Sequence, residues 1–187
     1  MKRTRLLSMA LSLAFAPAVL RAEPPRAFPP KEGFDIGVNY WASHAGMYMW
    51  RNWNAAQVER DLDRLAEQGI TVLRVFPLWP DFQPLTAAFR GRGVFRCWTQ
   101  NDGALKNYAA VDDGMVERFR FLCRAAEKRN LGLVVGLVTG WMSGRMFVPP
   151  ALERKNALTD AESIMWQTRY VRYLVEALKN ERAIVAW

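Results

Sequence analysis

Short apolar runs alternate with amphipathic segments along the chain from Phe34 onward. The runs cover residues 34–41, 70–76, 131–138 and 183–187, and their length and their β-branched and aromatic side chains predict strands buried on both faces. Between the runs, apolar residues recur at helical spacing over about 55–68, 113–129 and 160–178. Repeated strand and helix units of this kind predict an α/β fold in which helices cover a parallel sheet.

Polar residues mark the ends of the first and third predicted helices. Asn54 followed by Gln57 predicts an N-cap, and Gly69 predicts the C-cap of the same helix. Thr159 and Glu162 have the spacing of a capping box in front of the third helix. The expected core-facing stripe of that third helix is Ile164, Val171, Leu174, Val175 and Leu178.

Two architectures fit the alternation, an open doubly wound sheet and part of a (β/α)8 barrel. A nucleotide-binding doubly wound sheet carries a Gly-rich first turn, but the first predicted strand runs into Ala42–Gly46 without the G-x-G-x-x-G pattern. Gly91–Gly93 does not replace this turn, because it lies inside 84–111, which is expected to be a long irregular connection. The absence of a nucleotide-binding turn therefore favours the barrel.

The placement of unusual residues also favours the barrel, where functional residues gather at the C-terminal ends of the strands. The residues at or just past the four predicted strand ends are Asn39, Tyr40 and Trp41, then Arg74 and Trp79, then Thr139 and Trp141, and finally Trp187. We therefore predict a partial (β/α)8 TIM barrel, about the first four βα units, over residues 34–187.

The stretch ITVLRVFPLWPDFQP, residues 70–84, is the most informative of these strand ends. Arg74 interrupts a buried apolar run, and Pro77 and Pro80 end the strand. Trp79 and Asp81 follow on the loop. This strand is buried, carries a cation, and is followed by a tryptophan and polar residues. We therefore predict that it forms one wall of a ligand site.

The first 33 residues have the pattern of an export leader. MKRTR is a charged n-region, the following apolar run to Leu20 is an h-region, and Leu20-Arg21-Ala22 suits cleavage, so residues 1–22 are predicted to be a signal peptide. An uncleaved anchor is disfavoured because the run is shorter than the ~20 residues of a membrane span and contains Pro17. Residues 23–33 form a Pro-rich leader. We expect a secreted or periplasmic protein with no membrane partner after cleavage.

Charge and cysteine content exclude other classes of function. The formal charge of +8 falls to +4 without the four basic residues of the predicted signal peptide, and the remaining cations are interspersed with acids, which disfavours nucleic acid as a partner. With two cysteines and one histidine, no metal-ligand cluster is expected, and no cofactor. A disulfide between Cys97 and Cys123 stays open, because export would permit it.

Three strand-end segments together resemble a known family. GVNYW, LRVFPLWPDFQP and LVVGLVTGWMSGRMFVPPAL are similar, in this order, to the N-terminal half of clan A glycoside hydrolases, and most similar to family 5, the cellulase and β-mannanase group. The resemblance covers about residues 34–187. It implies that Arg74 supports a catalytic nucleophile. Many members have a histidine near the end of the third strand, where this chain has Val138-Thr139-Gly140.

The resemblance also implies a reaction. Members of the family cleave O-glycosidic bonds of β-linked polysaccharides such as mannan or cellulose by a retaining mechanism, which uses two carboxyl groups ~5–5.5 Å apart. The acid/base glutamate is expected in an Asn-Glu pair after the fourth strand, and the nucleophile on a later strand, both beyond Trp187. We therefore expect a fragment of a secreted glycoside hydrolase that is inactive alone and whose partner is an oligo- or polysaccharide. The alternative is a complete secreted carbohydrate-binding α/β domain without catalysis.

Candidate substrate-binding residues follow from these positions. Trp41, Trp79 and Trp141 follow strands and are expected to stack on sugars, whereas two or three of the six tryptophans in and around the site are expected to be core residues. The other candidates are Asn39, Tyr40, His44 and Asp81. His44 is expected to bind substrate or backbone, since no G-x-S-x-G elbow accompanies Ser43. Asp112 and Asp113 are expected to cap the second helix, and Arg74 could alternatively form a structural ion pair.

Overall fold

A computed structural model describes residues 34–90, 94–99 and 105–187. The predicted signal peptide, the Pro-rich leader and Gly91–Gly93 lie outside these residues. No helix in the described ranges is both long enough and apolar enough to cross a bilayer.

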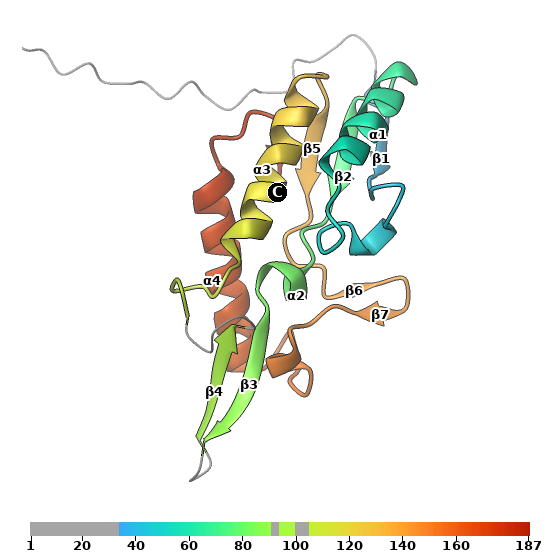
Figure 1. The fold of residues 1–187 in the computed structure, drawn as a ribbon. Coiled ribbons are helices and arrows are strands. Elements are labelled where there is room, and N and C mark those ends of the chain that lie inside the picture. Colours follow the sequence, from blue (N-terminus) through green and yellow to red (C-terminus); the bar gives the residue numbers. More distant parts are fainter. Residues whose placement is uncertain (1–33, 91–93, 100–104) are drawn as a thin grey trace, which may run out of the picture.

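One parallel sheet organises the molecule. It consists of β1 (Gly37–Asn39), β2 (Val72–Val75), β5 (Gly132–Val135) and β8 (Ile184–Ala186), and the strands lie side by side in chain order (Figure 1). Every neighbouring pair is parallel. A doubly wound sheet would reverse its strand order at a switch point, whereas a barrel adds each strand beside the last. The sheet is therefore wound as part of a (β/α)8 barrel, as the sequence predicts.

Three helices follow the strands, with the predicted caps at two of their N-termini. α1 (Ala55–Glu67) begins after Asn54, whose side chain accepts a hydrogen bond from the Gln57 N–H at 3.0 Å. α3 (Asp113–Glu127) begins after Asp112, whose carboxylate accepts from the Met115 N–H. The N-cap prediction for the third helix is wrong by one residue. Asp160, and not Thr159, caps α4 (Ala161–Leu178), because its carboxylate reaches the N–H groups of both Glu162 and Ser163.

The buried face of α4 is rotated from the predicted stripe. Ser163, Trp166, Tyr170, Leu174 and Leu178 are buried, while Ile164 is exposed. Two aromatic side chains determine this orientation, because Trp166 and Tyr170 enter the core and the Tyr170 hydroxyl donates to the carbonyl of Pro77 at 2.6 Å. Of the predicted stripe, Leu174 and Leu178 are thus buried, Val171 and Val175 are half-buried, and Ile164 is at the surface.

The long connection between β2 and α3 contains regular structure, contrary to the prediction. A short helix, α2 (Trp79–Phe82), follows β2, and an antiparallel hairpin of β3 (Leu85–Arg90) and β4 (Val94–Thr99) follows it. Figure 1 shows this hairpin extending away from the sheet. A second small hairpin of β6 (Trp141–Met142) and β7 (Arg145–Met146) follows β5, with single 3-10 turns at Gly46–Tyr48 and Pro150–Leu152.

The main core lies between the sheet and the helices. Leu73, Val75, Leu133 and Val135 face it from the strands. Near the C-terminal end of β2, Trp50 is fully buried. Its ring stacks on Trp53 and Phe119, and Phe82 packs against its edge. Cys123 is a free thiol buried in this core, so the disulfide with Cys97 that the sequence left open is not formed. Burial raises the pKa of this thiol well above its ordinary value, which keeps it protonated.

Candidate functional site

The sheet face opposite the helices carries one row of aligned residues. Parallel register places Asn39 beside Arg74, Arg74 beside Val134, and Val134 beside Ala186. Asn39, Arg74 and Ala186 are exposed and Val134 is half-buried. In a barrel this face points to the interior, where side chains from neighbouring strands form layers. Asn39 and Arg74 are thus the polar members of one layer, at the strand ends where barrel sites lie.

Aromatic rings support the Arg74 side chain. Its guanidinium lies 4.9 Å from the ring centroid of Phe76, which in turn stacks on Trp41 at 5.2 Å with an angle of 19° between the planes. Among the described residues Arg74 has no ion pair, so the structural salt bridge that was its alternative interpretation is not present within this part of the chain. The backbone is also fixed at this point, since the Arg74 carbonyl accepts from the Tyr40 N–H at 2.9 Å.

Tyr40 is held inside the protein and presents no surface to a ligand. It is 4% exposed, and its hydroxyl donates to Asp61 on α1 at 3.4 Å. Burial and the neighbouring Asp61 carboxylate raise the pKa of this hydroxyl well above its ordinary range. The prediction that Tyr40 binds substrate is therefore replaced by a role in tying the end of β1 to α1.

Asp61 fastens the loop after β1 through several hydrogen bonds. Its carboxylate accepts from the Ser43 N–H at 2.8 Å, from the Ser43 hydroxyl at 2.7 Å and from the Gln57 amide at 2.8 Å. Burial alone would raise the pKa of Asp61, but the hydrogen bonds from Ser43, Gln57 and Tyr40 outweigh it and lower the pKa below 3.8. This explains why Gln57 does not complete a capping box with Asn54.

Loss of the Asp61 charge is expected to destabilise the protein in a pH-dependent way. A carboxyl whose pKa is lower in the folded state contributes stability above its ordinary value of 3.8, and this contribution is lost as pH falls through the folded pKa. Asp61→Asn should therefore reduce the free energy of unfolding by about 2–3 kcal/mol at pH 7, with a smaller difference at pH 3. Urea denaturation at both pH values measures this. Glu67→Gln, on the same helix but exposed, is the control, and an equal loss for Asp61→Asn at both pH values would contradict the prediction.

Trp79 is part of the core and not of a ligand surface. Its side chain has no exposed area, and its indole N–H donates to the buried Gln83 amide oxygen at 2.6 Å. The Gln83 amide nitrogen donates in turn to the carbonyls of Ala109 and Trp166. The expectation that Trp79 stacks on sugar is corrected, because the short helix α2 turns the ring inward.

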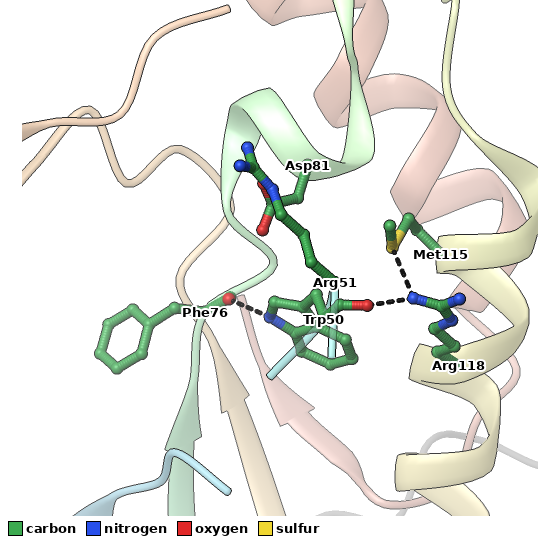
Figure 2. Close-up of polar contacts among 6 residues, drawn as sticks. All are labelled: Trp50, Arg51, Phe76, Asp81, Met115 and Arg118. Carbon is green, nitrogen blue, oxygen red and sulfur yellow. Dashed lines mark hydrogen bonds and ion pairs between the residues drawn. The ribbon is translucent and has the colours of Figure 1, made fainter. Parts of the chain in front are cut away.

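Asp81 also lies on α2, and its buried carboxylate forms an ion pair with an exposed arginine. Its carboxylate accepts from Arg51 Nε at 2.6 Å, and the side chains of Arg51 and Asp81 are 55% and 3% exposed. Burial raises the pKa of Asp81 above its ordinary value, and the Arg51 guanidinium partly offsets this rise. Figure 2 shows that the two side chains meet from different segments, the loop after β1 and α2.

The remaining predicted residues lie on exposed loops. His44 is exposed, with Nε2 2.7 Å from the carbonyl oxygen of Asn52, so it contacts backbone. Trp141 is 65% exposed and is paired across the β6–β7 hairpin with Met146. Trp41 is half-buried against Phe76. The structure therefore keeps Asn39, Trp41 and Arg74 together and places Trp141 on a separate loop.

Trp50 connects the loop after β1 to the end of β2. The sequence did not reveal this role. The indole N–H of Trp50 donates to the Phe76 carbonyl at 2.7 Å, and its own carbonyl accepts from Arg118 on α3 (Figure 2). Arg51 is the next residue, so this anchoring sets where its guanidinium lies. A tryptophan just after a predicted strand marks a candidate, but nothing in its spacing separates a core anchor from a ligand platform.

Comparisons with known proteins give a consistent family. The chain is 26% identical to mannan endo-1,4-beta-mannosidase A of Podospora anserina over 162 residues, which are 84% of this chain and 40% of that protein. Its structure matches that of GH5_18 from Streptomyces cattleya in complex with Manb1-4GlcNAc with a TM-score of 0.62 and 30% identity, covering 80% of this chain and 32% of that one. The chain is similar to glycoside hydrolases of family 5.

Further solved structures are also similar to this chain. The exo-beta-1,4-mannosidase Op5Man5 of an Opitutaceae bacterium has a TM-score of 0.62 and 29% identity, covering 78% of this chain and 22% of that one. A GH5_18 of Bifidobacterium longum matches the fold with a TM-score of 0.65 at 23% identity. No family model matches the sequence. The family 5-like chain spans about 40% of the curated relative and about a fifth to a third of these solved structures.

Proposed function

We propose that this chain is the N-terminal, sugar-binding part of a secreted glycoside hydrolase that cleaves β-mannosidic bonds by a retaining mechanism. The observation that carries the proposal is the exposed row at the strand ends, in which Arg74 rests on Phe76 without an acidic partner among the described residues. An arginine in this position can form an ion pair with a catalytic carboxylate that lies on another strand of the same barrel. Mannosidases and a Manb1-4GlcNAc complex among the relatives support a mannose-containing substrate.

In this proposal each residue has a limited role. Arg74 orients and stabilises the charge of the nucleophile, and Asn39 beside it donates to or accepts from substrate hydroxyls. Trp41 offers the part of its ring that Phe76 leaves uncovered to a sugar face. The two catalytic glutamates of this proposal would come from strands that follow β8.

The proposal is tested by the coding sequence beyond Trp187 and by the activity of its product. An Asn-Glu pair a few residues after β8, and hydrolysis of β-1,4-mannooligosaccharides with retention at the anomeric carbon, are expected. Proton NMR of the first product formed measures the stereochemistry. A longer product without that pair, or one that releases no sugar from β-mannosides or β-glucosides, would overturn the proposal in favour of a non-catalytic carbohydrate-binding domain.

A further inference from the structure

A concave surface lies between the three loops that follow β1, β2 and β5. It encloses about 210 Å³, and we call it the loop pocket. The residues that matter for its chemistry are Tyr48 and Arg51, Pro80 and Asp81, and Met146 and Glu153. None of these belongs to the sheet row that holds Arg74, so the loop pocket adds a second set of residues at the C-terminal ends of the strands.

The ion pair in the loop pocket leaves hydrogen-bonding capacity unused. Arg51 contacts Asp81 through Nε and one carboxylate oxygen, which is a single contact and not a paired fork. Arg51 has no other hydrogen-bond partner among the described residues. Figure 2 shows its two terminal amino groups extending past the Asp81 carboxylate. These amino groups are donors that a bound molecule can satisfy.

The charges of the loop pocket favour a neutral ligand with hydroxyl groups. Asp81 and Glu153 would repel a carboxylate or phosphate, and Arg51 would repel a cation. A sugar hydroxyl suits both kinds of group, since it accepts from a guanidinium and donates to a carboxylate. The size of the cavity also fits a single sugar ring better than the ~300–1,000 Å³ sites of drug-sized ligands.

An apolar wall completes the loop pocket. The Tyr48 ring is 50% exposed, and its hydroxyl accepts from Arg145 Nη1 at 3.1 Å, which fixes the ring beside the β6–β7 hairpin. Met146 is exposed in the same wall, and Trp141 is its partner across the hairpin. A ring beside a guanidinium and a carboxylate supplies the two faces of a sugar, one apolar and one hydroxylated.

From this geometry we infer that the loop pocket is an additional saccharide subsite, which holds one sugar unit of a substrate longer than a disaccharide. Arg51 binds its hydroxyls, Asp81 holds the Arg51 side chain in place, and Tyr48 packs on its ring. The inference rests on the proposed function for the chain's substrate class, but the pocket binds sugar whether or not hydrolysis follows. It makes Arg51 a residue that determines the preferred substrate length.

The test compares β-1,4-mannobiose and β-1,4-mannotetraose with the purified protein that carries this chain. Dissociation constants come from isothermal titration calorimetry, and kcat and KM from reducing-sugar release. Arg51→Gln and Tyr48→Ala should each weaken tetrasaccharide binding by about 10–100-fold and disaccharide binding by less than about twofold. Tyr48→Phe keeps the ring but loses the hydrogen bond from Arg145, so it should weaken tetrasaccharide binding less than Tyr48→Ala does. Arg124→Gln, an exposed arginine on α3, is the matched control.

The outcomes separate the two proposals. If neither Arg51→Gln nor Tyr48→Ala changes the affinity for the tetrasaccharide, the inference that the loop pocket binds sugar is wrong, even if the protein is an active hydrolase. Affinity that depends on these residues in a protein without hydrolytic activity supports the loop pocket and overturns the proposed function. An equal loss for both sugars in Arg51→Gln, with a lowered melting temperature, would mean that the ion pair is structural, and Tyr48→Ala with an unchanged melting temperature then decides.

Discussion

Replacing Trp50 with alanine is expected to reduce the free energy of unfolding by about 3–5 kcal/mol. The indole is fully buried and packs on three aromatic rings, so its removal leaves a cavity that Trp53, Phe82 and Phe119 cannot fill. The change also leaves the Phe76 carbonyl without its donor at the end of β2. Urea denaturation of wild type and variant, followed by circular dichroism, measures the difference.

Trp50→Phe separates packing from hydrogen bonding in the same experiment. Phenylalanine keeps most of the ring contacts and loses the N–H, so a loss of about 1–2 kcal/mol is expected. A loss below about 1 kcal/mol for Trp50→Ala would contradict the role of this residue as an anchor, because large-to-small changes in a packed core cost more. Arg51 and the loop pocket should also lose order in Trp50→Ala, since Trp50 precedes Arg51 directly.

The sequence predicts the fold better than the site, for a physical reason. The strands and helices follow from hydrophobic periodicity, and the cap at Asn54 is confirmed because local chemistry determines it. A strand also lies within the predicted range 70–76, but it covers Val72–Val75 and is buried on one face only, since Arg74 is exposed. The sequential strand order follows from repeated strand and helix units without a nucleotide-binding turn. The face of α4 was predicted only in part: Leu174 and Leu178 are buried as expected, but Ile164 is exposed, because Trp166 and Tyr170 were not weighed against β-branched residues.

The site residues depend on the direction of each side chain, which periodicity does not determine after a strand has ended. Trp79 and Trp141 both follow strands, yet a short helix turns Trp79 into the core while a hairpin leaves Trp141 exposed. Tyr40 and Asp61 are far apart in the sequence, and so are Arg51 and Asp81, so no local pattern connects them. Arg74 is the exception, because a cation inside an apolar strand is visible in the sequence itself.

Replacing Arg74 with alanine in the full-length enzyme is expected to lower kcat by about 10²–10³-fold. The guanidinium would no longer stabilise the charge of the proposed nucleophile, while substrate contacts elsewhere would keep KM nearly unchanged. Stability should change by less than about 1 kcal/mol, because Arg74 is exposed on the open sheet face and its described contact is with the Phe76 ring. Initial rates on β-1,4-mannooligosaccharides measure kcat and KM, and thermal melting measures stability.

Two variants decide whether Arg74 acts on the reacting groups or only supports the sheet. Arg74→Lys keeps the charge but loses the planar fork, so it should recover part of kcat without reaching wild type. Arg124→Ala removes an exposed arginine from α3 and should leave both kcat and stability unchanged. A wild-type kcat in Arg74→Ala would remove the residue from the mechanism. A fall in kcat that is matched by an equal fall in melting temperature across the Arg74 variants would instead assign it to packing on Phe76, because a catalytic contribution lowers kcat at constant stability.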